Sequence, residues 1–90
     1  MKNEQFTYNV LSDYIYFAMK GAVYNALDDG TITGKILACE GIFALGKTEV
    51  ECQQRLQSTL ESWILLGLKF KHPLPVIHGI NLNQEPRYEK

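Results

Sequence analysis

The chain has 90 residues, of which 46% are hydrophobic and 21% are charged, and its formal net charge is -1. This composition indicates one folded domain and argues against disorder over most of the chain. Because no cluster of lysine and arginine residues stands out, we expect no direct binding to DNA or RNA. The apolar stretches are too short to cross a bilayer and the N-terminus does not resemble a signal peptide, so we expect a cytoplasmic protein without membrane contact.

Apolar residues at helical spacing predict a first helix over residues 8–20. The residues on its apolar face are Leu11, Tyr14, Ile15, Ala18 and Met19. Gly21 is placed to end this helix in a left-handed cap. The polar residues that precede the helix are expected to be loose.

Three strands follow in the prediction, over residues 22–27, 31–39 and 42–45. Asp29-Gly30 predicts a β-hairpin between the first two, because both residues tolerate positive φ. The third strand follows a break at Glu40-Gly41. A three-stranded meander has unpaired edges, which are either protected or used to bind a partner.

A capping box at Thr48-Glu49-Val50-Glu51 predicts the start of a long helix that ends near residue 68. Its predicted buried face consists of Cys52, Leu56, Thr59, Leu60, Trp63, Leu66 and Gly67. Ile64, Leu65 and Leu68 point away from this face, so the end of the helix is apolar nearly all round. We therefore expect the first helix or another subunit to cover Ile64, Leu65 and Leu68.

The prolines at 73 and 75 exclude helix in the tail, and residues 76–82 are expected to form a short edge strand or to wrap around the body. The whole order predicts an α+β domain: an N-terminal helix, a three-stranded antiparallel meander, a long helix and an extended tail with a possible short final strand. Helices of this class cover one face of the sheet. We assign residues 1–90 to a single domain with a core at about residues 8–82 and loose termini.

Residues capable of catalysis or metal binding are isolated from one another in the sequence. His72 and His78 lack further ligands at compatible spacing, so no metal and no other cofactor is expected. Cys39 and Cys52 lie among apolar residues, which predicts buried thiols in preference to a disulfide or a nucleophile. The glycines at 30, 34, 41 and 46 form no phosphate-binding loop and are interpreted as turn and bulge residues. We predict that the chain is not an enzyme.

Three segments, taken in order, resemble HicB-like antitoxins. The first hairpin of that family is similar to Asp28-Asp29-Gly30-Thr31-x-x-Gly34-x-Ile36. The third strand, loop and capped helix of the family are similar to Gly41-x-x-Ala44-x-Gly46-x-Thr48-x-x-Glu51-Cys52. The helix end and tail of its short single-domain members are similar to Leu60-Glu61-x-Trp63-Ile64-Leu65-Leu66-Gly67-Leu68, followed by Pro73-x-Pro75-x-Ile77-x-Gly79-Ile80. The chain departs from the family at Leu37-Ala38-Cys39-Glu40, where prolines are common.

The resemblance implies a partial RNase-H-like fold without the metal-binding carboxylates of the nuclease. It also implies a type II antitoxin that neutralises a HicA-type mRNA interferase by covering its active surface. Asp28, Asp29 and Glu40 are the acidic residues that would face this small basic toxin. Longer members bind operator DNA through a further C-terminal segment that does not follow the tail here, so no direct DNA binding is expected. The family commonly forms dimers or larger oligomers such as tetramers, which would account for Ile64, Leu65 and Leu68.

Two other functions are left open by the sequence. One is a solitary homo-oligomeric scaffold or regulatory subunit without a toxin partner, because a fold does not dictate a function. The other is a metal-dependent nuclease, for which clustered carboxylates would be needed. Asp28 and Asp29 are adjacent at a hairpin tip, where aspartate is favoured for its turn geometry alone, and this argues against the nuclease.

Overall fold

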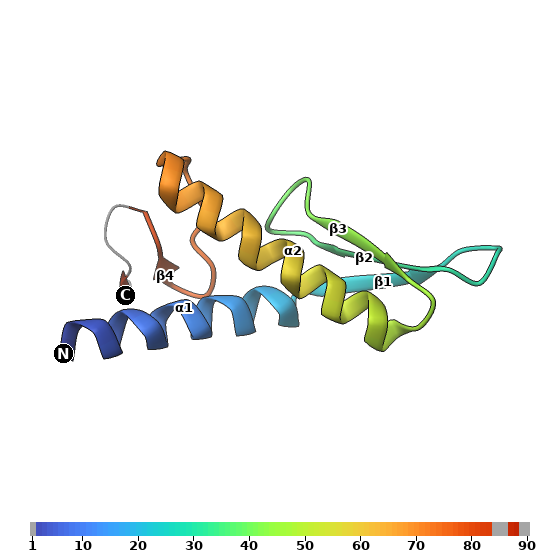
Figure 1. The fold of residues 1–90 in the computed structure, drawn as a ribbon, viewed down its shortest axis with the longest axis horizontal. Coiled ribbons are helices and arrows are strands. Elements are labelled where there is room, and N and C mark those ends of the chain that lie inside the picture. Colours follow the sequence, from blue (N-terminus) through green and yellow to red (C-terminus); the bar gives the residue numbers. More distant parts are fainter. Residues whose placement is uncertain (1, 84–86, 89–90) are drawn as a thin grey trace.

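The computed structural model describes residues 2–83 and 87–88. The elements are α1 (Lys2–Lys20), β1 (Ala22–Ala26), β2 (Ile32–Ile36), β3 (Phe43–Gly46), α2 (Glu49–Phe70), β4 (Ile80–Asn81) and β5 (Arg87–Tyr88). This order confirms the predicted α+β fold of helix, meander, long helix and short final strand (Figure 1). The helix α1 begins six residues earlier than predicted, because residues 2–7 carry no apolar periodicity that would reveal a helix. The tail from residue 84 to residue 90 was predicted to be loose, but Arg87–Tyr88 form strand β5; residues 84–86 and 89–90 lie outside the part that the structure describes.

The three strands of the main sheet are antiparallel in the order β1-β2-β3, as predicted. Of the two helices, α2 covers this sheet, packing against β3 and β2. The other helix, α1, lies beyond the sheet and packs against α2 and the tail (Figure 1). Strand β4 pairs with β5 in a separate two-stranded sheet, so the tail does not extend the main sheet. The molecule is therefore long, with extents of 48 × 22 × 22 Å.

The first hairpin has a three-residue loop. Leu27 donates its N–H to the carbonyl of Thr31 at 2.7 Å, and Gly30 donates to the carbonyl of Leu27 at 3.0 Å. Gly30 has φ 88°, whereas Asp29 is not among the residues of positive φ, so the prediction of two left-handed turn residues is wrong for Asp29. The Asp29 carboxylate instead accepts the N–H of Thr31 at 2.9 Å. Type I turns followed by a left-handed glycine have this form.

The start of α2 satisfies most of the predicted capping box. Thr48 Oγ1 accepts the N–H of Glu51 at 3.1 Å. The carboxylate of Glu51 accepts the N–H of Lys47 at 2.8 Å, one residue before the cap residue of the predicted pattern. At the other end, Lys71 adopts the left-handed conformation with φ 57° and donates to the carbonyl of Gly67. A lysine therefore occupies the position that glycine usually takes at a helix C-terminus.

The buried stripe of α2 differs from the predicted one in its second half. Its members are Cys52, Leu56, Leu60, Ile64 and Gly67. The stripe advances by four residues at each of its first three steps, which brings Ile64 into the core at 3% exposure and leaves Leu66 54% exposed. Because 3.6 residues make a turn, a run of four-residue steps drifts around the helix, and the prediction did not follow this drift.

Two glycines interpreted as turn or bulge residues have a different role. Gly34 and Gly46 lie within regular strand pairs, with Gly34 opposite Ala44 and Gly46 opposite Ile32. A Cβ on Gly46 would lie 2.5 Å from the backbone nitrogen of Cys52, and a Cβ on Gly34 would lie 2.9 Å from the Cys52 thiol. These glycines let the first turns of α2 lie directly on the sheet. Gly30 and Gly41 are turn residues of positive φ, as predicted.

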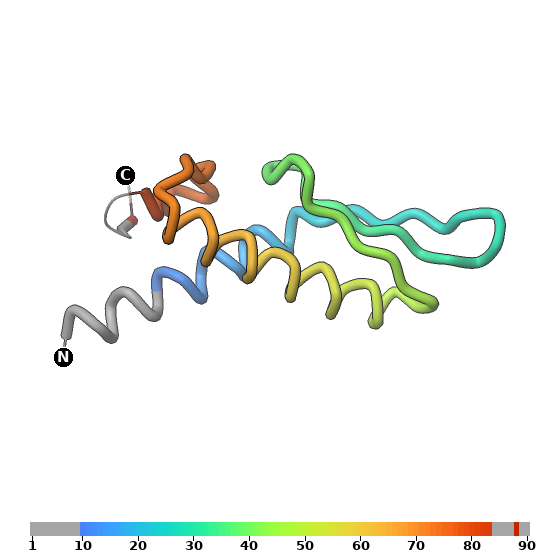
Figure 2. Tube along the Cα trace, turned by 45° about the horizontal axis from the view of Figure 1, so that its top comes forward, coloured from blue at the N-terminus to red at the C-terminus, as the bar shows by residue number. Residues whose placement is uncertain are grey.

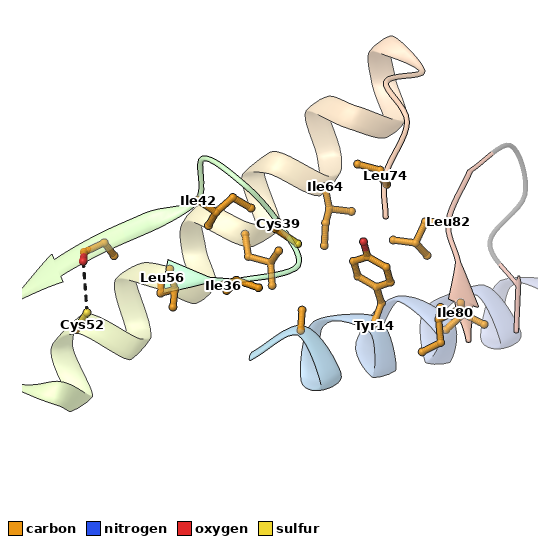
Figure 3. Close-up of a cluster of buried hydrophobic side chains, with 14 residues drawn as sticks. Tyr14, Ile36, Cys39, Ile42, Cys52, Leu56, Ile64, Leu74, Ile80 and Leu82 are labelled. Atoms are coloured by element: carbon orange, nitrogen blue, oxygen red, sulfur yellow. Dashed lines mark hydrogen bonds between the residues drawn. The ribbon is translucent and has the colours of Figure 1, made fainter. Parts of the chain in front are cut away.

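The second half of the core joins α1, α2 and the tail. Tyr14 is fully buried, and Figure 3 shows its ring among Ile64, Leu74 and Leu82. Its hydroxyl donates to the carbonyl of Pro75 at 2.7 Å. Nearby, the ring of His78 stacks on Phe17 with centroids 3.7 Å apart. The tail is thus fixed to α1 by contacts between residues that are more than sixty positions apart.

Candidate protein interface

The face of the sheet opposite α2 is uncovered by the described part of the chain. Strand alternation directs six side chains to this open face: Val23, Asn25, Thr33, Lys35, Phe43 and Leu45. The register sets Val23, Lys35 and Phe43 side by side in one row across the strands. Phe43 is 64% exposed, Leu45 46% and Val23 36%. Large apolar side chains gathered on one exposed face of a small protein are typical of an interaction surface.

The backbone groups on the outer edge of β3 have no strand partner in the described part of the chain, as the alternation of hydrogen bonds along the ladder shows. In an antiparallel ladder, pairs that exchange hydrogen bonds alternate with pairs that do not. Leu27 and Thr31 are joined by a backbone hydrogen bond. The pair of Asn25 and Thr33 lies two residues further along the same ladder, so it is also a hydrogen-bonded pair. Thr33 therefore directs its backbone groups toward β1 and away from Leu45. It follows that Phe43 and Leu45 direct their N–H and C=O groups outward, away from β2.

A groove of about 590 Å³ runs along this outer edge, between β3 and α2. Its lining residues are Phe43, Ala44, Leu45, Gln54, Arg55, Ser58 and Thr59. Arg55 crosses the groove and donates from Nη1 to the outward carbonyl of Leu45 at 3.1 Å. The same guanidinium lies 3.7 Å from the carboxylate of Glu51 on an exposed helix face. Within the described part of the chain, Arg55 thus partly covers the β3 edge.

The acidic residues predicted to face a partner lie at two separate places. Asp28 and Asp29 are at the exposed tip of the β1–β2 hairpin, and Glu40 is in the exposed turn at the other end of β2. Figure 2 shows these two turns at opposite ends of the sheet. The pKa of Asp29 is lowered because its carboxylate accepts hydrogen bonds from Thr31. The structure thus places these acids on the rim of the sheet and does not bring them into one cluster.

The three residues predicted to form an oligomer surface also separate. Ile64 is in the core at 3% exposure and is not available to another subunit. Leu68 is partly buried against that core, and Leu65 is 66% exposed. Leu66 and Phe70, with exposures of 54% and 57%, complete an exposed apolar end of α2. The sequence predicted unpaired edges of the meander but did not distinguish the β3 edge or identify the open face, for which the alternation in Phe43-Ala44-Leu45 was the available signal.

The thiols and imidazoles are not grouped. Cys39 and Cys52 are free and buried, and burial raises the pKa of Cys39 to about 11. Cys52 donates its thiol to the carbonyl of Ala44 at 3.6 Å (Figure 3). Among residues 2–83 and 87–88, no three histidines, cysteines or acids are close enough to hold a metal ion. Within the same residues, neither helix is both long and apolar enough to cross a bilayer.

The chain is similar to known proteins in both sequence and fold. The family model described as UPF0150-like matches residues 13–75, from the middle of α1 to the turn after α2. The fold is similar to that in the crystal structure of TTHA0281 from Thermus thermophilus, with a TM-score of 0.76 and 31% sequence identity. That similarity covers 82% of this chain and 93% of the other. No curated protein matches the chain in sequence.

Proposed function

The chain belongs to the UPF0150-like family, which is related to the HicB-like antitoxins, and from this membership we propose that it acts as an antitoxin. In this proposal it is a non-catalytic, cytoplasmic protein-binding module. It neutralises a HicA-type mRNA-cleaving toxin by covering the surface through which the toxin binds and cleaves RNA.

The observation that supports this proposal most directly is the open face of the sheet. Val23 on β1 and Phe43 and Leu45 on β3 expose apolar surface there, on either side of the polar Thr33 and Lys35 of the central strand β2. Exposed apolar side chains gathered on one face are typical of a surface that binds another protein. The rim acids Asp28, Asp29 and Glu40 add negative charge at both ends of this face. Such charges accelerate the association of a basic partner.

The experiment is co-expression of the chain with a HicA-type toxin whose expression alone arrests growth. We expect the wild-type chain to restore growth and to co-purify with the toxin in a fixed stoichiometry. Val23→Lys places a positive charge on the open face, and we expect it to weaken neutralisation at least tenfold. Reversing the charges of Asp28, Asp29 and Glu40 together is expected to slow association and to reduce its dependence on salt.

Controls separate a failure of binding from a failure of folding. Leu65→Lys changes an apolar residue that is more exposed than Val23 and lies far from the open face, and we expect it to neutralise the toxin as the wild type does. A wild-type chain that is folded and abundant but leaves the toxin fully active would reject the antitoxin proposal for that toxin class. Unchanged neutralisation by the folded Val23→Lys variant would remove the open face from the binding surface.

A second candidate function is a homo-oligomeric scaffold or regulatory subunit without a toxin, and the surface area of the chain favours it. The accessible surface is 6592 Å² for a mass of 10.3 kDa. A compact monomer of this mass exposes about 5,400 Å², so the excess is about 1,200 Å². A standard protein interface covers about 800 Å² on each partner. Purification of the chain alone from its native cells, as a defined oligomer without a growth-arresting partner, would favour this function.

A further inference from the structure

We propose that two copies of this chain pair antiparallel through the outer edges of their β3 strands, about a two-fold axis at Ala44. The product is one continuous sheet of six strands with an α2 helix from each copy on the same face. The inference does not depend on the proposed antitoxin function, since the surface that pairs is the β3 edge and the toxin would contact the open face.

The backbone of β3 is self-complementary in this arrangement. Phe43 and Leu45 both direct their N–H and C=O groups outward, at positions on either side of Ala44. With the axis at Ala44, Phe43 lies opposite the partner's Leu45, and the two residues exchange both backbone hydrogen bonds. The same exchange occurs between Leu45 and the partner's Phe43. Every outward backbone group of these two residues is then satisfied.

The side chains match the backbone register. Phe43 and Leu45 point to the open face, so each forms a cross-strand pair with the other residue type from the second copy. Directly opposite side chains in an antiparallel pair are close enough to pack, so each pair of Phe43 and the partner's Leu45 buries apolar surface. The most exposed apolar residues of the sheet would thus form a cluster of four at its centre.

The occupant is a second copy because the surface and the edge both indicate self-association. The excess of about 1,200 Å² over a compact monomer exceeds what one partner contributes to a standard interface. Natural edge strands are commonly protected by lysine, proline or bulges. Strand β3 reads Phe-Ala-Leu-Gly and has none of these, whereas its apolar sequence is nearly symmetric about Ala44. A two-fold interface requires this self-complementarity.

The groove beside β3 is compatible with the approach of a second α2. The helix residues that line it are Gln54, Arg55, Ser58 and Thr59, of which the last two are small. Arg55 would release the Leu45 carbonyl to the N–H of the partner's Phe43. That guanidinium bond is exposed to solvent, so exchanging it for a backbone bond changes the free energy little.

The first experiment measures molar mass by light scattering over a dilution series, with the full chain. We expect the wild type to have twice the chain mass of 10.3 kDa, and Phe43→Lys to have the chain mass at the same concentrations. The matched control is Val23→Lys, which places the same charge in the same row of the open face but on β1. It should remain dimeric. A monomeric wild type overturns the proposal, as does a dimer that Phe43→Lys leaves intact.

A second experiment tests the register and does not depend on a charge at the edge. Phe43→Cys and Leu45→Cys variants are prepared separately and then mixed under mild oxidation. Residues opposite each other in a hydrogen-bonded pair have Cα atoms about 5.5 Å apart, within the range of a disulfide. We expect the mixture to form a disulfide-linked dimer and each variant alone to form none. Equal cross-linking in all three samples, or in none, would overturn the axis at Ala44.

Discussion

At the scale of single residues, burial and close contact between elements determine which positions are sensitive to substitution. Gly46 and Gly34 admit the first turns of α2 onto the sheet, and the sequence did not distinguish them from the turn glycines because neither has a conformational signature. Tyr14 was predicted to lie on the apolar face of its helix, and it does. Its partner, the Pro75 carbonyl, could not be predicted, since 61 residues separate the two and no local pattern links them.

Gly46 on β3 and Gly67 on α2 provide a matched pair of substitutions, because each lies in close contact with another element. In Gly46→Ala, the new Cβ meets the backbone of Cys52 at 2.5 Å, so α2 must shift away from β3. We expect the free energy of unfolding to fall by about 1–3 kcal/mol. In Gly67→Ala, the new Cβ meets only the side chain of Leu74, 2.6 Å from Cδ2 and 3.3 Å from Cγ, and that side chain can shift where backbone cannot.

Alanine also favours helix over glycine by about 1 kcal/mol, so Gly67→Ala is expected to change stability little. Urea unfolding followed by circular dichroism measures both variants. A Gly46→Ala protein as stable as the wild type would show that α2 does not require this close approach to the sheet.

At the scale of elements, the strongest local signals were the most accurate. The capping box located the start of α2, and Asp29-Gly30 located the hairpin, because both signals are satisfied within a few residues. The end of α2 was predicted near residue 68 and lies at Phe70. No glycine marks it, so the stop depends on Lys71 adopting a conformation that lysine disfavours.

Replacement of Lys71 by glycine is expected to stabilise the helix end. A left-handed conformation costs a non-glycine residue about 1–2 kcal/mol, and glycine avoids this cost. Glycine also loses more conformational entropy on folding, and this loss offsets part of the gain. We expect a gain of up to about 1 kcal/mol, which raises the Tm of a domain of this size by about 4–8 °C. Lys71→Ala is the control, because it removes the same charge and keeps the strain. Equal Tm values for the two variants would assign the effect to charge.

At the scale of the whole molecule, the fold was predictable and the interface was not. The order of elements follows from local periodicity and turn chemistry. The open face and the β3 edge depend on which side α2 covers, and that side is set by the packing of Cys52 and Leu56 against the strands. The predicted acids Asp28 and Glu40 lie at opposite ends of β2, because the strand between them separates its two turns.

Buried acidic protons make the stability of the whole domain sensitive to alkaline pH. Burial raises the pKa of Cys39 from 9.0 to about 11. Burial, followed by the nearby Cys39, also raises the pKa of Tyr14 above its ordinary value of 10.0. The unfolded chain therefore loses these protons at a lower pH than the folded one. Stability is fully present below about pH 9 and is lost as the pH rises through 11.

Chemical unfolding from pH 7 to 11 measures this loss. We expect Cys39→Ala to show a shallower decline between pH 9 and 11 than the wild type, because one of the titrating groups is absent. The shift of the Cys39 pKa corresponds to at most about 2–3 kcal/mol. Tyr14 continues to titrate in this variant, so some decline remains. Parallel curves for the two proteins would show that Cys39 ionises as readily in the folded state as in the unfolded one.

The attachment of the tail to α1 has a consequence for synthesis on the ribosome. Tyr14 is bonded to Pro75, and Phe17 stacks on His78, so these partners of α1 are translated 61 residues after the helix residues that they contact. The strands and the first half of α2 contact one another over short sequence separations, so their contacts can form much earlier in translation. During translation, the apolar face of α1 therefore stays without its partners after the hairpin has formed. The nascent chain presents that face to chaperones, or to another nascent chain on the same messenger RNA, until the tail emerges from the exit tunnel.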